Sequence, residues 1–285
     1  MKTILIQLDT DPQPSSFDRV VAVDAGVDEL FSYGGVTPEN VEPLVHGAMF
    51  TRGPADLKNT ALFIGGSNVA AGEAVLEKVL RTFFGPMRVS VMMDSNGSNT
   101  TAAAAVLAAS KHLDLAATEA LVLGGTGPVG LRAAQILASQ GAEVHVASRS
   151  LERAEQACAT IARNVEGAKL TACTSEGDGL QEALGRVQLV IAAGAAGVQF
   201  FDADGWQAAD SLKVAIDLNA VPPVGLGGIE VTDKGVEHAG VTCYGAIGVG
   251  GTKMKVHRAA IAKLFESNSL VLDTAAIYEI ATSLG

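Results

Sequence analysis

The sequence predicts an α/β protein of two domains, and three observations lead to this class. Short apolar runs alternate with amphipathic helical stretches along the chain, as in β-α-β units of a parallel sheet. This alternation is interrupted once, near residues 113–118, which divides the predicted strands and helices into two series. The length of 285 residues suits one large domain or two smaller ones.

The first series contains the apolar runs 4–8, 61–64 and 89–93, which we interpret as strands. A further apolar run, 17–25, follows a turn rich in Asp and Pro. Two helices are expected, one with an apolar face over residues 69–80 and an Ala-rich one over 100–110. The strand 89–93 stops at the polar turn 94–99, so that turn lies at a carboxyl end of the sheet, where ligands of open α/β sheets gather.

The second series predicts a doubly wound parallel sheet with right-handed crossovers. After a glycine run at 245–251, two helices are expected to end the chain. The predicted strands are 120–123, 144–147, 189–193 and 214–216, and the predicted helices are 129–140, 151–162, about 253–267 and about 274–283.

Composition excludes several classes of protein. The chain has 20 Lys and Arg against 31 Asp and Glu, a formal net charge of −11, which argues against binding to a nucleic-acid backbone. With 48% apolar and 18% charged residues, long disordered tails are not expected. No apolar run approaches the roughly 20 residues that span a bilayer, and the first residues do not form a signal peptide. We expect a cytoplasmic protein without membrane contact, compatible with a homo-oligomer.

The most specific motif is G-x-G-x-x-G at Gly125, Gly127 and Gly130. It follows the apolar strand 120–123 and opens the helix 129–140, the context that a dinucleotide-binding loop requires. Glycines permit the tight turn and the close approach of a pyrophosphate to the helix N-terminus. A purely structural strand-to-helix turn is the alternative.

The end of the next strand bears on which dinucleotide binds. An NAD-selective site usually carries Asp or Glu there, about 20 residues after the glycine loop, but this chain has Ser148, Arg149 and Ser150. An arginine can pair with a 2′-phosphate and the hydroxyls can donate hydrogen bonds to it, which favours NADP. The alternative is a solvated arginine. The small residues at 192–195 suit a wall along the cofactor or a plain tight turn.

Common catalytic arrangements are missing from the sequence. No pair among the five histidines has zinc-motif spacing with a third ligand nearby, so no metal site is expected. There is no G-x-S-x-G elbow, and the three cysteines are interpreted as reduced and mostly structural. Tyr-x-x-x-Lys, the acid-base pair of many hydroxyl-oxidising dehydrogenases, is also absent. An alcohol oxidation that needs a strong base is therefore disfavoured.

Polar loops at strand ends are the remaining candidates. Asp94 and Asn96 could hydrogen-bond a heterocycle rich in N–H donors, or they could cap a turn. Lys253 follows glycines that let the backbone approach a ligand; the alternative is a solvated lysine at a helix start.

Two further groups are equally open. Asp217 and Asn219 could cap the last strand or line a nicotinamide pocket. Asp18 and Asp24 could face a ligand or be surface turn residues.

Seven segments carry a likeness to a known family: 17–18, 51–53, 83–86, 94–102, 124–130, 248–255 and 261–267. They resemble the NADP-dependent methylene-tetrahydromethanopterin dehydrogenases of methylotrophic bacteria. The resemblance implies a pterin domain over 1–110, an NADP-binding Rossmann domain over 111–252, and C-terminal helices over 253–285 that pack on the first domain.

The resemblance also implies hydride transfer from methylene-tetrahydromethanopterin to NADP in one-carbon (formaldehyde) oxidation, with methylene-tetrahydrofolate as another carrier. Removing hydride from a carbon between two nitrogens leaves a stabilised cation, so positioning replaces an acid or base. We expect Lys253 and Asp94 to position the reaction. The expected substrate residues are Phe17, Asp18, Asp94, Ser95, Asn96, Thr100 and Lys253. The expected cofactor residues are Gly125, Thr126, Gly127, Pro128, Val129, Ser148, Arg149, Ser150, Ala193, Gly194 and Asn219.

Two other readings remain open. A shikimate-like or amino-acid dehydrogenase on a similar scaffold would need a proton relay, for which Lys58 or Lys253 with Asp94 are candidates. A non-catalytic NADP sensor would need no second polar site, and the 94–101 loop counts against it.

Overall fold

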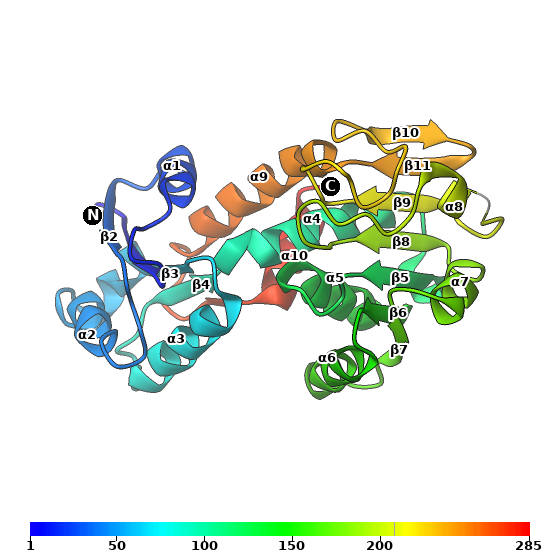
Figure 1. Cartoon of the computed structure of the whole chain (residues 1–285). Helices are drawn as coiled ribbons and strands as arrows, with labels where there is room; N and C mark the ends of the chain where they lie inside the picture. The colour runs from blue at the N-terminus through cyan, green and yellow to red at the C-terminus, as the bar shows by residue number, and fades with distance from the viewer. Residues whose placement is uncertain (208) are drawn as a thin grey trace. The chain divides into compact units, whose positions relative to one another are not determined.

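The computed structural model describes residues 1–207 and 209–285 and divides into two compact units. The first unit joins Met1–Thr100 to Met254–Gly285, and the second is Thr101–Lys253. The first unit is therefore discontinuous in sequence, because the chain leaves it, builds the second unit and then returns. Figure 1 follows this path from the blue N-terminus to the red C-terminus.

The first unit is built on a parallel sheet of five strands in the order β12-β4-β3-β1-β2. Its strands are β1 (Ile4–Asp9), β2 (Glu29–Tyr33), β3 (Thr60–Gly65), β4 (Ser90–Met93) and β12 (Val271–Leu272). The strand order reverses between β1 and β3, which makes their carboxyl ends the topological switch point. The pairing of β12 with β4 returns the C-terminal segment to the first sheet.

The helices of the first unit include α1 (Ser16–Asp24), α2 (Glu42–Phe50), α3 (Val69–Thr82) and α10 (Thr274–Ser283). Helices α2 and α3 cover one sheet face, where Val45, Met49 and Val75 pack against Leu8 and Leu62. Caps set the helix starts, because the side chains of Asn68 and Asp273 accept backbone N–H groups of the first turns of α3 and α10.

Two helices carry the chain across the boundary between the units: α4 (Ser98–Ser110) and α9 (Ala246–Lys263). The predicted helix at about 253–267 begins seven residues earlier than expected. The glycine run 245–251 was interpreted as a loop, but most of it is helical. Lys253 consequently lies within a helix and not at its start.

The second unit contains a doubly wound sheet of seven strands in the order β10-β11-β9-β8-β5-β6-β7 (Figure 1). All pairs are parallel except the β10-β11 hairpin. The order reverses between β5 and β8, as in dinucleotide-binding Rossmann sheets. The strands are β5 (Glu119–Leu123), β6 (Glu143–Ser148), β7 (Lys169–Thr174), β8 (Leu189–Ala192), β9 (Val214–Asp217), β10 (Lys234–His238) and β11 (Val241–Tyr244).

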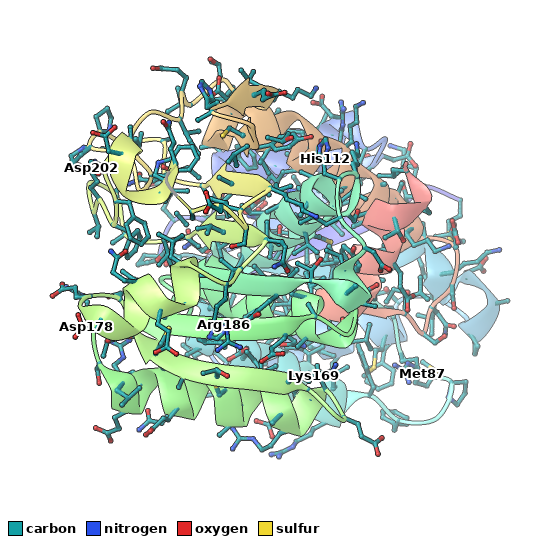
Figure 2. All side chains as sticks on the ribbon, turned by 90° about the vertical axis from the view of Figure 1, so that its right-hand side faces the viewer. Met87, His112, Lys169, Asp178, Arg186 and Asp202 are labelled. Atoms are coloured by element: carbon teal, nitrogen blue, oxygen red, sulfur yellow. The ribbon has the colours of Figure 1, made fainter. Side chains whose placement is uncertain are left out.

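Helices α5 (Pro128–Ser139), α6 (Leu151–Asn164), α7 (Asp178–Leu184) and α8 (Ala203–Gln207) complete this unit. Its core centres on the fully buried Trp206, whose indole N–H donates to the Gly227 carbonyl at 2.8 Å. Figure 2 shows the side chains of this unit, with Asp178 at the start of α7 and Arg186 just beyond its end.

The predicted α/β class with a doubly wound second sheet is confirmed. Strands β2, β7, β10, β11 and β12 and helices α2, α7 and α8 were not predicted. The run 17–25 is a helix, α1. Short 3₁₀ turns occupy Pro54–Asn59, Ser95–Gly97 and Leu115–Ala117. None of the helices in the described ranges combines the length and apolar content of a bilayer-spanning segment.

Candidate functional site

The glycine loop after β5 is shaped by close backbone contacts. Gly124 has φ +69°, and a Cβ there would lie 2.7 Å from the carbonyl oxygen of Ala193, which follows β8. A Cβ on Gly130 would lie 2.3 Å from the Gly124 carbonyl oxygen, so α5 packs directly on the turn. Only glycine is compatible with these close contacts. Because Gly124 follows β5 and contacts Ala193 after β8, the loop lies at the β5-β8 switch point.

Helix α5 begins with N–H groups that no side chain caps. Gly127 is the N-cap residue, and Pro128 occupies the first helical position, where its missing N–H costs nothing. The first N–H groups of a helix have no partner within it, and the helix dipole makes that end attractive to anions. The loop therefore fits the pyrophosphate of a dinucleotide.

A cavity of about 220 Å³ lies along this loop, entirely within the second unit. Seven of the eleven predicted cofactor residues line it: Thr126, Gly127, Ser148, Arg149, Ser150, Ala193 and Gly194. Its lining does not include Gly125, Pro128, Val129 or Asn219. It does include Ala195, from the predicted small-residue wall, and five residues that were not among the expected cofactor residues: Gly124, Arg153, Ser175, Val198 and Phe200.

The far end of the cavity, at the carboxyl end of β6, is rich in hydroxyls and positive charge. Ser148 is buried, and its Oγ lies 3.4 Å from Thr126 Oγ1. Ser150 caps α6 by accepting the N–H of Arg153. Arg149 and Arg153 are exposed, and within the described ranges neither pairs with a carboxylate. No acidic residue lines the cavity, so it suits an anion although the chain is acidic.

Arg153 could have been found from its position. It lies four residues after Arg149 in the first turn of α6, so the strand end and the helix N-terminus bring the two arginines to one cavity. Ser175 follows β7 and donates its N–H to the Ser148 carbonyl at 2.9 Å, which ties the third strand end to the second.

Asp217 and Asn219 form hydrogen bonds that hold the loop after β9, and neither is among the residues that line the cavity. The buried Asp217 carboxylate accepts the N–H groups of Asn219 and Leu226, at 2.9 and 2.8 Å, and so closes the loop after β9. Burial raises the pKa of the Asp217 carboxyl, and the backbone hydrogen bonds oppose that rise. Asn219 donates to the carbonyls of Ala195 and Pro223. The capping alternative is therefore observed for both residues.

A buried polar network lies at the switch point of the first unit. The Asp9 carboxylate, at the end of β1, is fully buried and accepts the N–H groups of Asp11 and Ser15, both at 2.9 Å. Gln7 donates to Asp9 at 3.3 Å and accepts the Ser32 hydroxyl at 2.8 Å. This network fixes the loop that leads into α1. It was not predicted, because Gln7 lies within the predicted strand 4–8 and Asp9 begins the polar turn after that strand.

Helix α1 presents two of the predicted substrate residues. Phe17 is about half exposed at 48%, and its ring centroid lies 6.3 Å from that of the buried His257 of α9. His257 also stacks on Phe63, with centroids 5.6 Å apart. A Cβ on Gly65 would lie 3.4 Å from the Asp18 carboxylate, which places that carboxylate over the end of β3.

The predicted segment 94–100 follows β4 and is held by its own hydrogen bonds. The buried Asp94 carboxylate accepts the N–H groups of Asn99 and Thr100, at 2.9 and 3.0 Å, and the Thr100 hydroxyl at 2.6 Å. Ser95 is buried and donates to the Gly65 carbonyl. Asn96 is exposed at φ 55°. Asp94 thus caps α4, and Asn96 is the member of the segment that presents its side chain to solvent.

The two lysines considered for a proton relay are placed differently. Lys253 is half-buried within α9 and is the last residue of the second unit. Lys58 is exposed in the 3₁₀ turn before β3, at the amino end of that strand. Asp94 lies at the carboxyl edge of the same sheet, and a six-residue strand spans roughly 20 Å. A relay from Lys58 to Asp94 is excluded by this separation.

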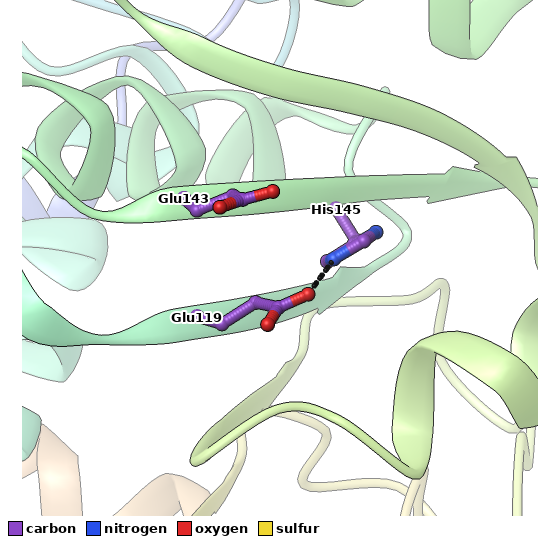
Figure 3. A group of neighbouring side chains, drawn as sticks. All are labelled: Glu119, Glu143 and His145. Carbon is purple, nitrogen blue, oxygen red and sulfur yellow. Dashed lines mark hydrogen bonds and ion pairs between the residues drawn. The ribbon is translucent and has the colours of Figure 1, made fainter.

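One group of side chains in the described ranges has the composition of a metal site, although none was predicted. Glu119, Glu143 and His145 offer ligand atoms within 4.8 Å of one another (Figure 3). His145 Nε2 lies 2.7 Å from Glu119 Oε1, and Arg186 Nε lies 3.3 Å from the same oxygen. The guanidinium already supplies positive charge there. The group lies at the amino ends of β5 and β6, opposite the glycine loop, so it belongs to sheet stability and not to the cavity.

The comparisons with known proteins agree with this architecture. The N-terminal domain family of methylene-tetrahydromethanopterin dehydrogenase matches residues 16–96. The solved structure of quinate dehydrogenase from Corynebacterium glutamicum with NAD has a TM-score of 0.57 at 15% identity and covers 99% of both chains, which shows a shared fold.

Two proteins of Methylorubrum extorquens are similar along their whole length. The bifunctional protein MdtA is 46% identical over 285 residues, with 99% of both chains covered. The NAD(P)-dependent methylenetetrahydromethanopterin dehydrogenase is 31% identical over 299 aligned positions, again with 99% of each chain covered. Since such identity extends over both units, the chain belongs to the methylene-tetrahydromethanopterin dehydrogenase family.

Proposed function

We propose that the protein catalyses reversible hydride transfer from methylene-tetrahydromethanopterin to NADP, giving the methenyl cation and NADPH. The observation that carries the NADP assignment is the cavity end formed by Ser148, Arg149, Ser150 and Arg153. The family to which the chain belongs supports the pterin.

The cofactor assignment rests on charge. The ribose of NAD is usually held by an acidic side chain at the end of the second strand, and here that position has hydroxyls and arginines. A carboxylate would repel a 2′-phosphate, whereas each hydrogen bond from a charged group contributes about 1.5–3 kcal/mol. NADP, when bound, supplies the nicotinamide ring that accepts the hydride.

The side chains of this protein position the reactants. The methylene carbon lies between two nitrogens, whose lone pairs stabilise the cation left behind, so no proton has to be abstracted. Holding two reactants in attack geometry supplies roughly 7–11 kcal/mol. The Asp9 network and the Asp94 cap make the loops at the carboxyl edge of the first sheet rigid. We assign three side chains to the pterin: Phe17 and Asp18 at the start of α1, and Asn96 in the segment after β4.

Lys253 and Asp94 are assigned positioning roles. We expect Lys253→Gln to raise KM for the pterin while kcat falls less than tenfold, because the proposed reaction requires no proton transfer by the lysine. Loss of turnover with unchanged binding of both substrates would contradict this assignment and would favour a lysine-dependent relay. We further propose that the protein acts in the cytoplasm as a homo-oligomer, in one-carbon oxidation.

A four-way assay tests the function. Purified protein is offered methylene-tetrahydromethanopterin and methylene-tetrahydrofolate separately, each with NADP and with NAD, and formation of reduced nucleotide is followed by absorbance. NADPH formation with the methanopterin supports the whole proposal. Turnover of the folate alone overturns the carrier assignment, and NADP binding without oxidation of either pterin supports a sensor or a shikimate-like substrate.

A further inference from the structure

The first unit contains a second cavity, of about 370 Å³, which the proposed function does not use. We call it the edge cavity, because it is lined by helix α2 and by β1 and β2, the last two strands at one edge of the sheet. Its wall is mostly apolar, with Ile4, Ile6, Phe31, Leu44 and Ala48 among the lining residues. The volume is in the range of pockets that hold small organic ligands.

A buried hydroxyl without a partner lines the edge cavity. Thr60 is 3% exposed, and its Oγ1 has no hydrogen-bond partner. Thr60 pairs in register with Ile4 of β1, so its side chain projects from the same sheet face as Ile4, the face on which the cavity lies. A buried polar group without a hydrogen bond costs about 1–3 kcal/mol, so this hydroxyl indicates a polar ligand atom.

An arginine without a carboxylate partner lines the same cavity. Arg52 donates to the carbonyls of Asn59 and Lys2, at 2.6 and 3.0 Å, and no described carboxylate forms an ion pair with it. These two bonds hold the guanidinium and leave three of its five N–H groups available. Asn59 immediately precedes Thr60, so the positive charge and the orphan hydroxyl lie at one end of the cavity.

The edge cavity is separate from the loops assigned to the pterin. Arg52, Thr60 and Ile4 lie at the amino ends of β3 and β1, whereas Asp9 and Gly65 end those strands at the carboxyl edge. Six residues of strand span roughly 20 Å. A ligand bound at the polar end of the edge cavity is therefore a second ligand and not part of the pterin.

We propose that the edge cavity binds a small apolar carboxylate, an organic acid with an alkyl or aryl body. Its hydrocarbon part would fill the space beside Ile6 and Phe31, and its carboxylate would pair with Arg52 and accept the Thr60 hydroxyl. The competing occupant is a second copy of this chain, since Phe31 and Tyr33 are 44% and 41% exposed. The Arg52 guanidinium and the unpaired Thr60 hydroxyl favour the organic acid. The apolar surface of a second copy would provide neither an anion for the guanidinium nor an acceptor for the hydroxyl.

Calorimetric titration of the full-length protein tests the proposal, with NADP present at saturation to fill the nucleotide cavity. The probes are octanoate and 1-naphthoate, with 1-octanol as the uncharged analogue. We expect one carboxylate per chain, bound at least tenfold more tightly than the alcohol. Arg52→Gln should weaken octanoate binding at least tenfold, and Thr60→Val should weaken it severalfold. Arg81→Gln, at an exposed arginine of α3, should leave binding unchanged.

A filling variant covers the case in which Arg52→Gln fails to fold. Gly47 lines the cavity within α2, and a Cβ there would meet no atom within 4 Å. Gly47→Leu should keep the fold, raise helix propensity and abolish octanoate binding. Absence of binding by both acids, equal binding of acid and alcohol, or unchanged binding in Gly47→Leu overturns the proposal. Self-association that Gly47→Leu disrupts, without binding of either acid, would assign the surface to a second copy.

Discussion

Replacing Arg149 with glutamine removes one of the two guanidinium groups at the proposed 2′-phosphate end of the nucleotide cavity. The side chain is exposed and forms no ion pair with a described carboxylate, so its loss should leave the free protein unchanged in stability. A hydrogen bond to a charged group contributes about 1.5–3 kcal/mol, and solvent screening favours the lower value here. About 1.4 kcal/mol corresponds to a tenfold change in affinity.

We therefore expect Arg149→Gln to weaken NADP binding about tenfold. With Arg153→Gln added, the loss should reach roughly a hundredfold, while NAD affinity changes less than about twofold. Dissociation constants from fluorescence titration, and kcat/KM with each nucleotide, measure the effect. Arg163→Gln, near the exposed C-terminal end of the same helix, is the matched control. Equal losses for NADP and NAD would refute the reasoning, because they would place Arg149 on a part shared by both nucleotides.

Three further outcomes are expected. Gly124→Ala should lower the free energy of unfolding by a few kcal/mol more than Gly167→Ala in denaturant titration, since both glycines have φ near +70° but only Gly124 faces backbone atoms within 3 Å. Burial raises the pKa of the Cys243 thiol to about 12, so the folded state retains a proton that the unfolded state loses near pH 9. The stabilisation by the neutral thiol is therefore complete below pH 9 and is lost as the pH rises toward 12. Between these pH values the free energy of unfolding should fall more steeply in the unmodified protein than in Cys243→Ala. Asp9→Asn replaces an acceptor oxygen by an N–H₂ group facing backbone donors, and should cost about 1–3 kcal/mol in unfolding free energy and raise KM for the pterin.

Much of the second unit was predictable because its signals are local. The glycine loop needs only a strand, three glycines and a helix in succession, and the structure places Gly124 and Gly130 in contacts that forbid a Cβ. Ser148 at the end of β6, and Arg149 and Ser150 directly after it, follow from the same reasoning. Arg153 was missed, although it lies in the first turn of the predicted helix 151–162, four residues after Arg149, and that spacing indicates that both arginines reach one cavity.

The first unit was harder to predict because its site is built from pairing between distant segments. β2 is a partly exposed edge strand with little apolar alternation, and β12 has only two residues, so neither gives a periodic signal. The Asp9 network depends on Gln7, Ser15 and Ser32 meeting across the sheet. The glycine-rich start of α9 was predicted as a loop because glycine disfavours helix, but tertiary packing overrides that propensity.

The discontinuous first unit has a consequence for synthesis on the ribosome. Residues 101–253 form a contiguous unit and can fold as soon as they leave the exit tunnel. The first sheet is complete only after residues 271–272 emerge and pair with β4, so until then the nascent chain exposes an unpaired edge of that sheet. Residues 254–285 therefore complete a sheet that begins with residues 4–9. A premature stop near residue 264 would release a chain with a finished nucleotide-binding unit and an open, aggregation-prone sheet edge.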